Sequence, residues 1–312
     1  MWHILRNLLV AHKIAFCPRY PLIYNTEVMK KHLLVTGGAG FLGNHLLRRA
    51  THFMTAGTLY HTPSSSLPEV TFHVCDLQNP EEIRILLNRV KPDIIIHTAC
   101  SDQGHNLEAI VPAAGLLAMQ TAQRHIRFIH LSTDQVFDGT SAPYTEESPT
   151  QPINPYGVAK AQAEDLILSL NPQATIIRTS LLYDLRKPDR QTKWIMESMA
   201  TSQPIRLFVD EIRCPVWGEN LAEVLLELAL KDVPGILHLG GPESLNRWDF
   251  GMGVLHHFGI TPTSNIQKGT IEESGLVRPK NLTMDSSRAK QILQTPLLSL
   301  QEARRMAITS ES

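Results

Sequence analysis

The sequence is poor in cysteine, nearly free of net charge and without a long apolar run. Its 312 residues include 29 basic and 30 acidic side chains, so charge gives no reason to expect nucleic acid or an anionic membrane as a partner. No apolar stretch approaches the roughly 20 residues that a membrane span requires. The cysteines stand singly, which excludes the common zinc patterns and fits a reducing, cytoplasmic location. We expect no metal site, and structural thiols at Cys17, Cys75, Cys100 and Cys214.

A glycine-rich turn follows the first apolar run of the compact sequence. The run HLLVT is suited to a buried parallel strand, and it leads directly into Gly37, Gly40 and Gly43. In a dinucleotide site such glycines make the tight turn, admit a pyrophosphate close to the backbone, and let helix pack on strand. The helix that starts near Phe41 and Leu42 would direct its N-terminal amides at the phosphates. The alternative is a structural glycine turn without a ligand.

Strands and helices alternate through the next hundred residues. VTFHVC runs to Asp76 and Leu77, where the carboxylate could meet an adenine ring, and a helix is expected at about 80–90. PDIIIHTA ends in small residues at Ala99, and FIHLST ends at Thr133. This alternation predicts an α/β fold, a Rossmann-type doubly wound parallel sheet with helices on both faces. Right-handed crossovers would place the glycine turn, Ala99 and Thr133 along the carboxyl edge of that sheet.

The domain boundaries follow from the place of the first strand. Met29 begins MKKHLLVTGGAGFLG, which reads as a domain start, and residues 1–28 carry no cleavage site of a signal peptide. We expect 1–28 to be an N-terminal extension outside the fold and 29–180 to form the NAD(P)-binding Rossmann domain. Residues 181–312 should be mainly a smaller substrate-binding region, with a segment at about 216–240 that returns to the sheet.

The segment after the second expected strand bears on the choice of cofactor. Enzymes that select NAD often place a carboxylate there, which binds the ribose 2′-hydroxyl. This chain has His61, Thr62 and a run of serines at 64–66 instead. Without a repelling charge, a 2′-phosphate could be accommodated, so we expect NADP(H), with NAD(H) as the alternative. The alternative is that the serines simply form a loop that plays no part in the choice between NADP(H) and NAD(H).

Tyr156 and Lys160 lie four residues apart in a segment expected to be helical, so both side chains project from one face. A free tyrosine hydroxyl, with a pKa near ~10, is too weak an acid to protonate an alkoxide efficiently at neutral pH. An ammonium group one turn away is expected to lower that pKa, and Thr133 could hydrogen-bond the same substrate oxygen. The alternative is a chance pattern of a half-buried tyrosine and a solvated lysine.

Several segments together resemble the extended short-chain dehydrogenase/reductases, and most closely the dTDP-4-dehydrorhamnose reductase group. They are TGGAGFLG, LSTDQVFDG, PYTEE and PINPYGVAKAQAE, with FVDEIRCP and RPKN further along, and the similarity spans about 30–293. The resemblance implies Thr133, Tyr156 and Lys160 as a catalytic trio, with Lys160 also holding the nicotinamide ribose. It further implies that the less regular C-terminal third covers a nucleotide sugar.

The resemblance also implies binding residues. Those for the cofactor are Gly37, Gly40, Phe41, Leu42, Gly43, Asp76, Leu77, Ala99, Tyr156 and Lys160. Those for the substrate are Thr133, Gln135, Arg213 and Arg278. Arg278 is the residue from which we expect a contact to a substrate phosphate.

Three positions depart from the pattern of that reductase group. Gln135 stands where the group has tyrosine, Leu181 and Leu182 follow Ser180 where it typically has tryptophan, and Pro112 stands where the extended family supplies an asparagine. The catalytic pair is thus retained while the expected substrate wall has changed.

These features predict an NADPH-dependent reductase of a keto group on a nucleotide-activated sugar, with Tyr156 as the proton donor. Two alternatives remain. One is a sugar-nucleotide epimerase or dehydratase, which would use the same Tyr156 and Lys160 but recycle its cofactor. The other is a non-catalytic regulatory module, because the beta subunit of methionine adenosyltransferase resembles the same reductase group. The expected partners are a small nucleotide sugar and, as one option, a second copy of the chain.

Overall fold

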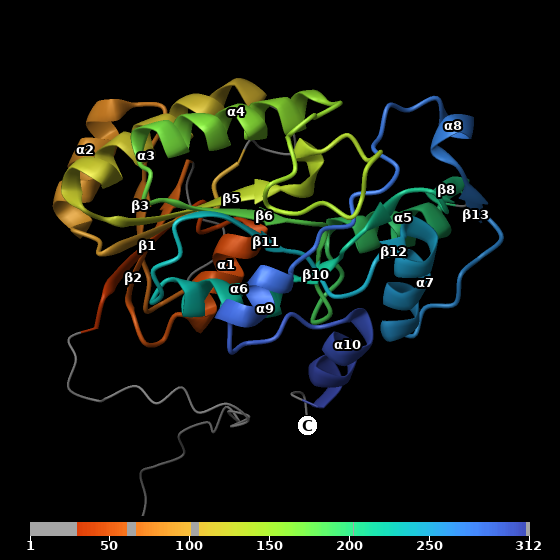
Figure 1. The fold of residues 1–312 in the computed structure, drawn as a ribbon. Helices are drawn as coiled ribbons and strands as arrows, with labels where there is room; N and C mark the ends of the chain where they lie inside the picture. Colours follow the sequence, from red (N-terminus) through yellow and green to blue (C-terminus); the bar gives the residue numbers. More distant parts are fainter. Residues whose placement is uncertain (1–29, 61–66, 101–105, 202, 310–312) are drawn as a thin grey trace, which may run out of the picture.

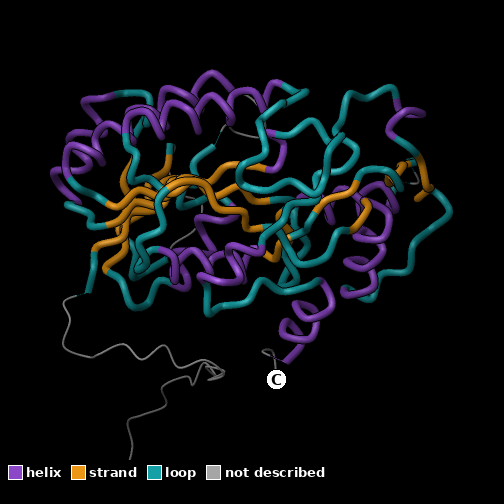
Figure 2. Tube along the Cα trace, viewed as in Figure 1, coloured by secondary structure: helices purple, strands orange, loops and turns teal. Residues whose placement is uncertain are grey.

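The protein is built as a central sheet between two layers of helices, with a smaller region at one end (Figure 1). The computed structural model describes residues 30–60, 67–100, 106–201 and 203–309. The expected extension at 1–28 and the serine-rich segment at 61–66 therefore lie outside the described residues. Figure 2 shows the strands as one layer with helices above and below it.

Seven parallel strands form the central sheet, in the order β11-β6-β5-β4-β1-β2-β3. Their bounds are β1 (His32–Thr36), β2 (Met54–Leu59), β3 (Thr71–Val74), β4 (Ile94–His97), β5 (Arg127–Thr133), β6 (Thr175–Thr179) and β11 (Gly235–Leu239). All the neighbouring pairs are parallel. The predicted doubly wound sheet is confirmed, with strand order reversing at β1.

Helices cover both faces of this sheet (Figure 1). The helices α2 (Pro80–Val90), α3 (Ile110–Arg124) and α4 (Pro155–Leu170) pack on one face, and α1 (Phe41–Arg49), α6 (Gly218–Leu228) and α9 (Ser287–Ile292) pack on the other. The run Ile94–His97 shows why both faces are covered. Ile95 packs in the core under α2, α3 and α4, whereas Ile94 and Ile96 pack in the core under α1, α6 and α9. All three are buried, as expected for a central parallel strand.

The smaller region lies beyond the carboxyl edge of the sheet. Its helices are α5 (Arg190–Ala200), α7 (Arg247–His257), α8 (Ile271–Ser274) and α10 (Leu300–Thr309). Its short strand pairs are β7 (Leu182–Tyr183) with β10 (Val216–Trp217), β9 (Ile212–Arg213) with β12 (Leu245–Asn246), and β8 (Ile205–Phe208) with β13 (Ile266–Gly269). Two further apolar cores hold this region together, one around Trp217 and one around Leu207.

The chain crosses between the two regions more than once. It leaves the sheet after β6, builds the first part of the smaller region, and returns through α6 and β11. α6 packs on α1, and β11 pairs with β6 from Gly235 to Leu239. The placement of β11 agrees with the expected return near 216–240, while a boundary at residue 180 stays a prediction. Within the described parts of the chain, no helix has both the length and the apolar character to cross a membrane.

Candidate active site

The carboxyl ends of four neighbouring strands lie along one edge of the sheet. Thr36 of β1 pairs with His97 of β4, and Thr133 of β5 pairs with Thr179 of β6. The glycine turn follows Thr36, and Ala99 follows β4. The edge where these segments meet is the place where open α/β sheets bind ligands.

The glycine turn leaves room for a dinucleotide close to the backbone. Gly37 has a φ of +68°, which favours glycine, and a Cβ there would lie 2.8 Å from the Cα of Ala99. A Cβ at Gly43 would overlap the carbonyl oxygen of Gly37, so only glycine allows α1 to start this close to the turn. The turn is fixed because the N–H of Gly38 donates to the carbonyl of Thr58 over 2.8 Å. The residues present therefore fit a pyrophosphate.

Among the expected cofactor residues, Leu42 can contribute only through its backbone, whereas the Phe41 ring is partly exposed. The Leu42 side chain is buried in the core between α1 and the sheet, and the Phe41 ring makes an edge contact with His45 at 5.0 Å. The N–H groups of the first helical turn have no partner within the helix, so they can face an anion. Asp76 and Leu77 lie beyond the carboxyl end of β3, where Asp76 caps a turn by accepting from the N–H of Gln78 over 2.9 Å.

The start of α4 is fixed by its capping residues. Asn154 accepts a hydrogen bond from the N–H of Gly157 over 2.8 Å, and Pro155 occupies the first helical position, where proline is well tolerated. Asn154 also donates to the side chain of Gln135 over 3.1 Å, which ties α4 to the segment after β5. The helix therefore starts at a defined place, and this fixes the position of Tyr156 one residue later.

Tyr156 lies close to a thiol that the sequence did not single out. Its hydroxyl is hydrogen-bonded to Cys100, and its pKa is raised well above the usual range, first by burial and then by Cys100. The positive charge of Arg213 opposes that rise. The expected lowering of this pKa by Lys160 is therefore wrong for this structure, because burial dominates. The expectation that Cys100 is a structural thiol is also corrected, because it is exposed and bonded to Tyr156.

Lys160 is buried with its ammonium group held beneath β5. Its Nζ donates to the carbonyl of Leu131 over 2.7 Å, and burial lowers its pKa, while Cys100 and Glu164 act in the opposite direction. Two buried histidines lie within the range of its charge. The pKa of His97 is lowered to about 3 and that of His130 well below its usual value, in both cases by burial first and by Lys160 second. Both rings are therefore neutral at physiological pH.

A buried ion pair lies one turn further along the same face of α4. Glu164 accepts from Arg178 Nε at 3.1 and 3.2 Å and from Arg178 Nη2 at 2.7 Å, and it also accepts from the hydroxyl of Ser132. The positions 156, 160 and 164 share one helical face. Through Ser132 and Arg178, Glu164 thus connects this face of α4 to β5 and β6, one helical turn after Lys160.

A second buried pair fixes the strand end that carries Thr133. The hydroxyl of Thr133 accepts from the N–H of Gln135 over 3.2 Å. The next residue, Asp134, is fully buried and accepts from Arg213 Nε and Nη2 at 2.7 and 2.5 Å, and from Ser180 at 2.5 Å. Arg213 is therefore committed to positioning this strand end, and its direct contact with substrate stays a prediction.

The structure brings most of the predicted residues together, from different elements. Gly37, Ala99, Tyr156 and Thr133 adjoin the carboxyl edge, and the charges of Asp134 and Arg213 act on Tyr156. Arg278 lies outside this cluster, in the smaller region, where its Nη1 donates to Glu211 over 3.2 Å. Catalytic and binding roles for these residues stay predictions.

Sequence reasoning missed four residues of the neighbourhood. They are Cys100, Asp134, Glu164 and Arg178. A signal existed for Cys100, because it directly follows Ala99 at the end of an expected strand. The pairing of Asp134 with Arg213 spans 79 positions, and no local pattern reveals it. Among the described residues, no group of three or more histidine, cysteine or acidic side chains could hold a metal ion.

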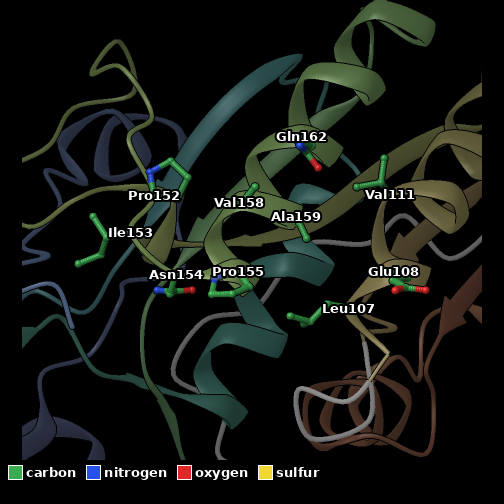
Figure 3. Close-up of a pocket in the computed structure, with 10 residues that line it drawn as sticks. All are labelled: Leu107, Glu108, Val111, Pro152, Ile153, Asn154, Pro155, Val158, Ala159 and Gln162. Atoms are coloured by element: carbon green, nitrogen blue, oxygen red, sulfur yellow. The ribbon is translucent and has the colours of Figure 1, made fainter. Parts of the chain in front are cut away.

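A hollow of about 640 Å³ lies between the N-terminal parts of α3 and α4 (Figure 3). Val111 projects from α3, and Val158, Ala159 and Gln162 project from α4, around it. Val158 is partly exposed, and its position lies on a different face of α4 from Lys160. The hollow is thus on the outer side of the helix layer and is separate from the proposed reaction centre.

Comparison with known proteins gives relatives of two kinds. A dTDP-4-keto-6-deoxy-D-glucose reductase of Streptomyces niveus is 31% identical over 75% of this chain and 81% of its own length. The methionine adenosyltransferase 2 subunit beta of Xenopus tropicalis is 26% identical over 90% of this chain and 89% of its own.

A solved structure agrees in fold. The dTDP-4-dehydrorhamnose reductase of Bacillus anthracis, in complex with NADP, matches with a TM-score of 0.75 at 21% identity, over 91% of this chain and all of that one. The profile of the family described as RmlD substrate binding domain matches residues 30–311. The resemblance seen in the sequence is confirmed, and the chain belongs to the RmlD substrate-binding-domain family.

Proposed function

We propose that the protein is an NADPH-dependent reductase of a keto group on a nucleotide-activated sugar, and that this keto group is at the 4-position of the sugar. The observation that carries this proposal is the convergence of Tyr156 and Thr133 with a glycine turn that fits a pyrophosphate. Family membership and the Streptomyces niveus reductase support the same reaction and a deoxyhexose attached to dTDP. NADP(H) is the proposed cofactor, and NAD(H) is the alternative.

The proposed chemistry assigns one task to each of three side chains. A bound nicotinamide cofactor supplies the hydride. Thr133 orients the substrate carbonyl through its hydroxyl, and Tyr156 donates the proton to the carbonyl oxygen. Lys160 keeps two N–H groups beyond the one that Leu131 accepts, so it can hold a hydroxyl of the cofactor.

The Tyr156→Phe variant tests this assignment. It removes only the hydroxyl, so the proton donor is lost while the ring that packs beside Cys100 stays. Turnover of a dTDP-4-keto-6-deoxyhexose, followed as loss of NADPH absorbance, should fall by on the order of 10² or more. Binding of NADPH, followed by its fluorescence, should stay within about twofold of the wild-type value.

A matched control is Tyr183→Phe. The Tyr183 hydroxyl is buried and has no hydrogen-bond partner among the described residues, so its removal should leave turnover unchanged. Equal turnover in the wild type and in Tyr156→Phe would contradict the proposed mechanism.

A second candidate function is regulatory. The match to the methionine adenosyltransferase 2 subunit beta covers 90% of this chain, more than the match to the reductase does. The changed wall at Gln135, Leu181 and Leu182 is compatible with it, while the retained Thr133 and Tyr156 favour catalysis. Recovery of a stoichiometric synthetase partner, together with no turnover on any keto sugar, would support regulation.

The remaining alternatives differ in cofactor use and assembly. An epimerase or dehydratase would show product formation without net consumption of NADPH, whereas the proposed reductase consumes one NADPH for each keto group.

A homodimer and a cytoplasmic location are part of the proposal. Light scattering of the purified protein and fractionation of cells test these two points.

A further inference from the structure

Among the described residues, four hydrogen bonds reach the carboxylate of Asp134, and they are not equally short. Arg213 donates through Nε and Nη2 at 2.7 and 2.5 Å, and the hydroxyl of Ser180 donates at 2.5 Å. The hydroxyl of Thr133 is the fourth donor, and it lies 3.3 Å from Oδ1. Hydrogen bonds between two oxygens normally span about 2.5–3.0 Å, so the Thr133 hydroxyl is held only weakly.

Thr133 is the residue to which the proposed function assigns the substrate carbonyl. A hydroxyl has one proton to donate and two lone pairs that accept, whereas an ionised carboxylate only accepts. The N–H of Gln135 donates to one lone pair of the Thr133 hydroxyl over 3.2 Å, and the single proton is directed at Asp134. This proton must therefore turn away from Asp134 before it can be donated to an oxygen of the substrate.

Arg213 determines how strongly Asp134 competes for that proton. Asp134 is fully buried and the Arg213 side chain is 9% exposed, so water screens the charge of the carboxylate very little. An unpaired carboxylate at this place would bind the adjacent hydroxyl tightly, because hydrogen bonds to charged groups are the strong ones. Arg213 donates one N–H to each oxygen and carries the compensating charge. With Arg213 in place, the attraction of Asp134 for the Thr133 proton is therefore weak.

The contact between Asp134 and Arg213 joins the sheet to the smaller region. Thr133 ends β5, Ser180 directly follows β6, and Arg213 ends β9. The N–H of Cys214, the next residue after Arg213, donates to the hydroxyl of Ser180 over 3.2 Å. This contact gives the smaller region a direct path to the hydroxyl of Thr133, through Asp134.

We propose that Asp134 and Arg213 are positioning residues for the proposed reaction. Asp134 orients the proton of the Thr133 hydroxyl, and Arg213 neutralises Asp134, so that this proton can turn to the keto oxygen of the substrate. Negative charge develops on that oxygen as the hydride arrives, and a hydroxyl that is free to donate stabilises it. This role rests on the proposed function. It differs from the predicted substrate contact of Arg213, because Arg213 acts through Asp134 and need not touch the sugar.

Four proteins test this role: the wild type, Thr133→Val, Arg213→Met and the variant with both changes. Thr133→Val removes the hydroxyl and keeps the shape of the side chain. In the wild type it should lower kcat for a dTDP-4-keto-6-deoxyhexose on the order of 10- to 100-fold, the value of a hydrogen bond to a charged group. Arg213→Met should lower kcat by a similar factor, because Asp134 then retains the proton. Adding Thr133→Val to Arg213→Met should change kcat by less than about twofold.

Unfolding by urea measures the same effect without any substrate. Thr133→Val should lower the urea midpoint little in the wild type, because the bond to Asp134 is long. It should lower the midpoint more in Arg213→Met, where the hydroxyl becomes a main partner of a buried carboxylate.

Thr179→Val is the matched control. Thr179 ends β6 in register with Thr133 and is equally buried, but its hydroxyl donates to the carbonyl of Leu239 over 2.9 Å. Its replacement should therefore shift the urea midpoint by the same amount with and without Arg213.

Equal effects of Thr133→Val in both backgrounds, on kcat or on the urea midpoint, would overturn the proposal. Arg213 would then act independently of Thr133, as a substrate contact or as a structural residue. If Arg213→Met does not fold, Arg213→Lys takes its place, because lysine keeps the charge but loses the contact to both carboxylate oxygens. Equal effects of Thr133→Val with and without Arg213→Lys would overturn the proposal as well.

The outcome is distinguishable from a failure of the proposed function. A wild type that never consumes NADPH, together with unequal shifts of the urea midpoint, would refute the reductase and keep the link from Arg213 through Asp134 to Thr133. A wild type that reduces the keto sugar, while Thr133→Val has the same effect in both backgrounds, would keep the reductase and overturn this inference.

Discussion

Breaking the buried pair of Glu164 and Arg178 should destabilise the protein strongly. Both side chains are at most 3% exposed, and Arg178 makes three N–H contacts to this carboxylate. Its Nη1 has no other partner among the described residues, so Glu164→Gln leaves a charged guanidinium group in a site of low dielectric. Removing one partner of such a pair costs about 3–5 kcal/mol.

The double variant Glu164→Leu with Arg178→Met should recover much of that loss. Apolar side chains of similar volume need no charge partner, and such replacements are often neutral or stabilising. The free energy of unfolding is measured by urea denaturation followed by circular dichroism. The control is Glu81→Gln, which breaks an exposed pair with Arg84 and should leave the urea midpoint unchanged.

The single and double variants together test whether the pairing of Glu164 with Arg178 stabilises the fold. A loss below about 1 kcal/mol in Glu164→Gln would mean that water or another group satisfies Arg178, and the estimate from burial would be refuted. A double variant no more stable than the single one would show that Glu164 matters through Ser132 instead of through Arg178.

Three further variants test the site. Gly43→Ala places a Cβ against the carbonyl of Gly37, so NADPH affinity, followed by fluorescence, should fall by a factor corresponding to roughly 1–3 kcal/mol. In Cys100→Ala, a group that raises the pKa of Tyr156 is lost, so the alkaline limb of the turnover profile should move to lower pH; an unmoved limb would contradict the contact. The ring of His97 has its pKa lowered from 6.5 to about 3, so only the unfolded chain takes up its proton as pH falls below 6.5. The contribution of His97 to the free energy of unfolding should therefore be complete above that pH and should fall by about 2 kcal/mol between pH 7 and pH 5. Urea denaturation at the two pH values should show this loss in the wild type and not in His97→Gln.

The sequence was most informative where the evidence is local. The apolar run before Gly37, the spacing of the glycines and the alternation of strands and helices each depend on neighbouring residues, and they predicted the sheet and the glycine turn. Asn154 and Pro155 marked the start of α4 for the same reason, since capping is a contact within one turn.

The rest depends on contacts between distant segments. Asp134 and Arg213 form a pair only because the fold brings the end of β5 next to β9. Glu211 forms ion pairs with Arg247 and Arg278 only because strand pairing in the smaller region brings their segments together. The pKa of Tyr156 was also misjudged, because spacing along a helix shows a neighbouring charge but not the depth of burial, which here has the larger effect.

The late position of β11 in the chain affects how the protein can be synthesised. β6 ends at Thr179, but its outer neighbour is not complete until Leu239. While the ribosome makes the intervening sixty or so residues, at roughly 5–20 residues per second, the edge of β6 has no partner strand. Unpaired edges of this kind recruit other chains. Nascent chains of this protein therefore pass through a stage of several seconds in which a chaperone that shields β6 would raise the yield of folded molecules.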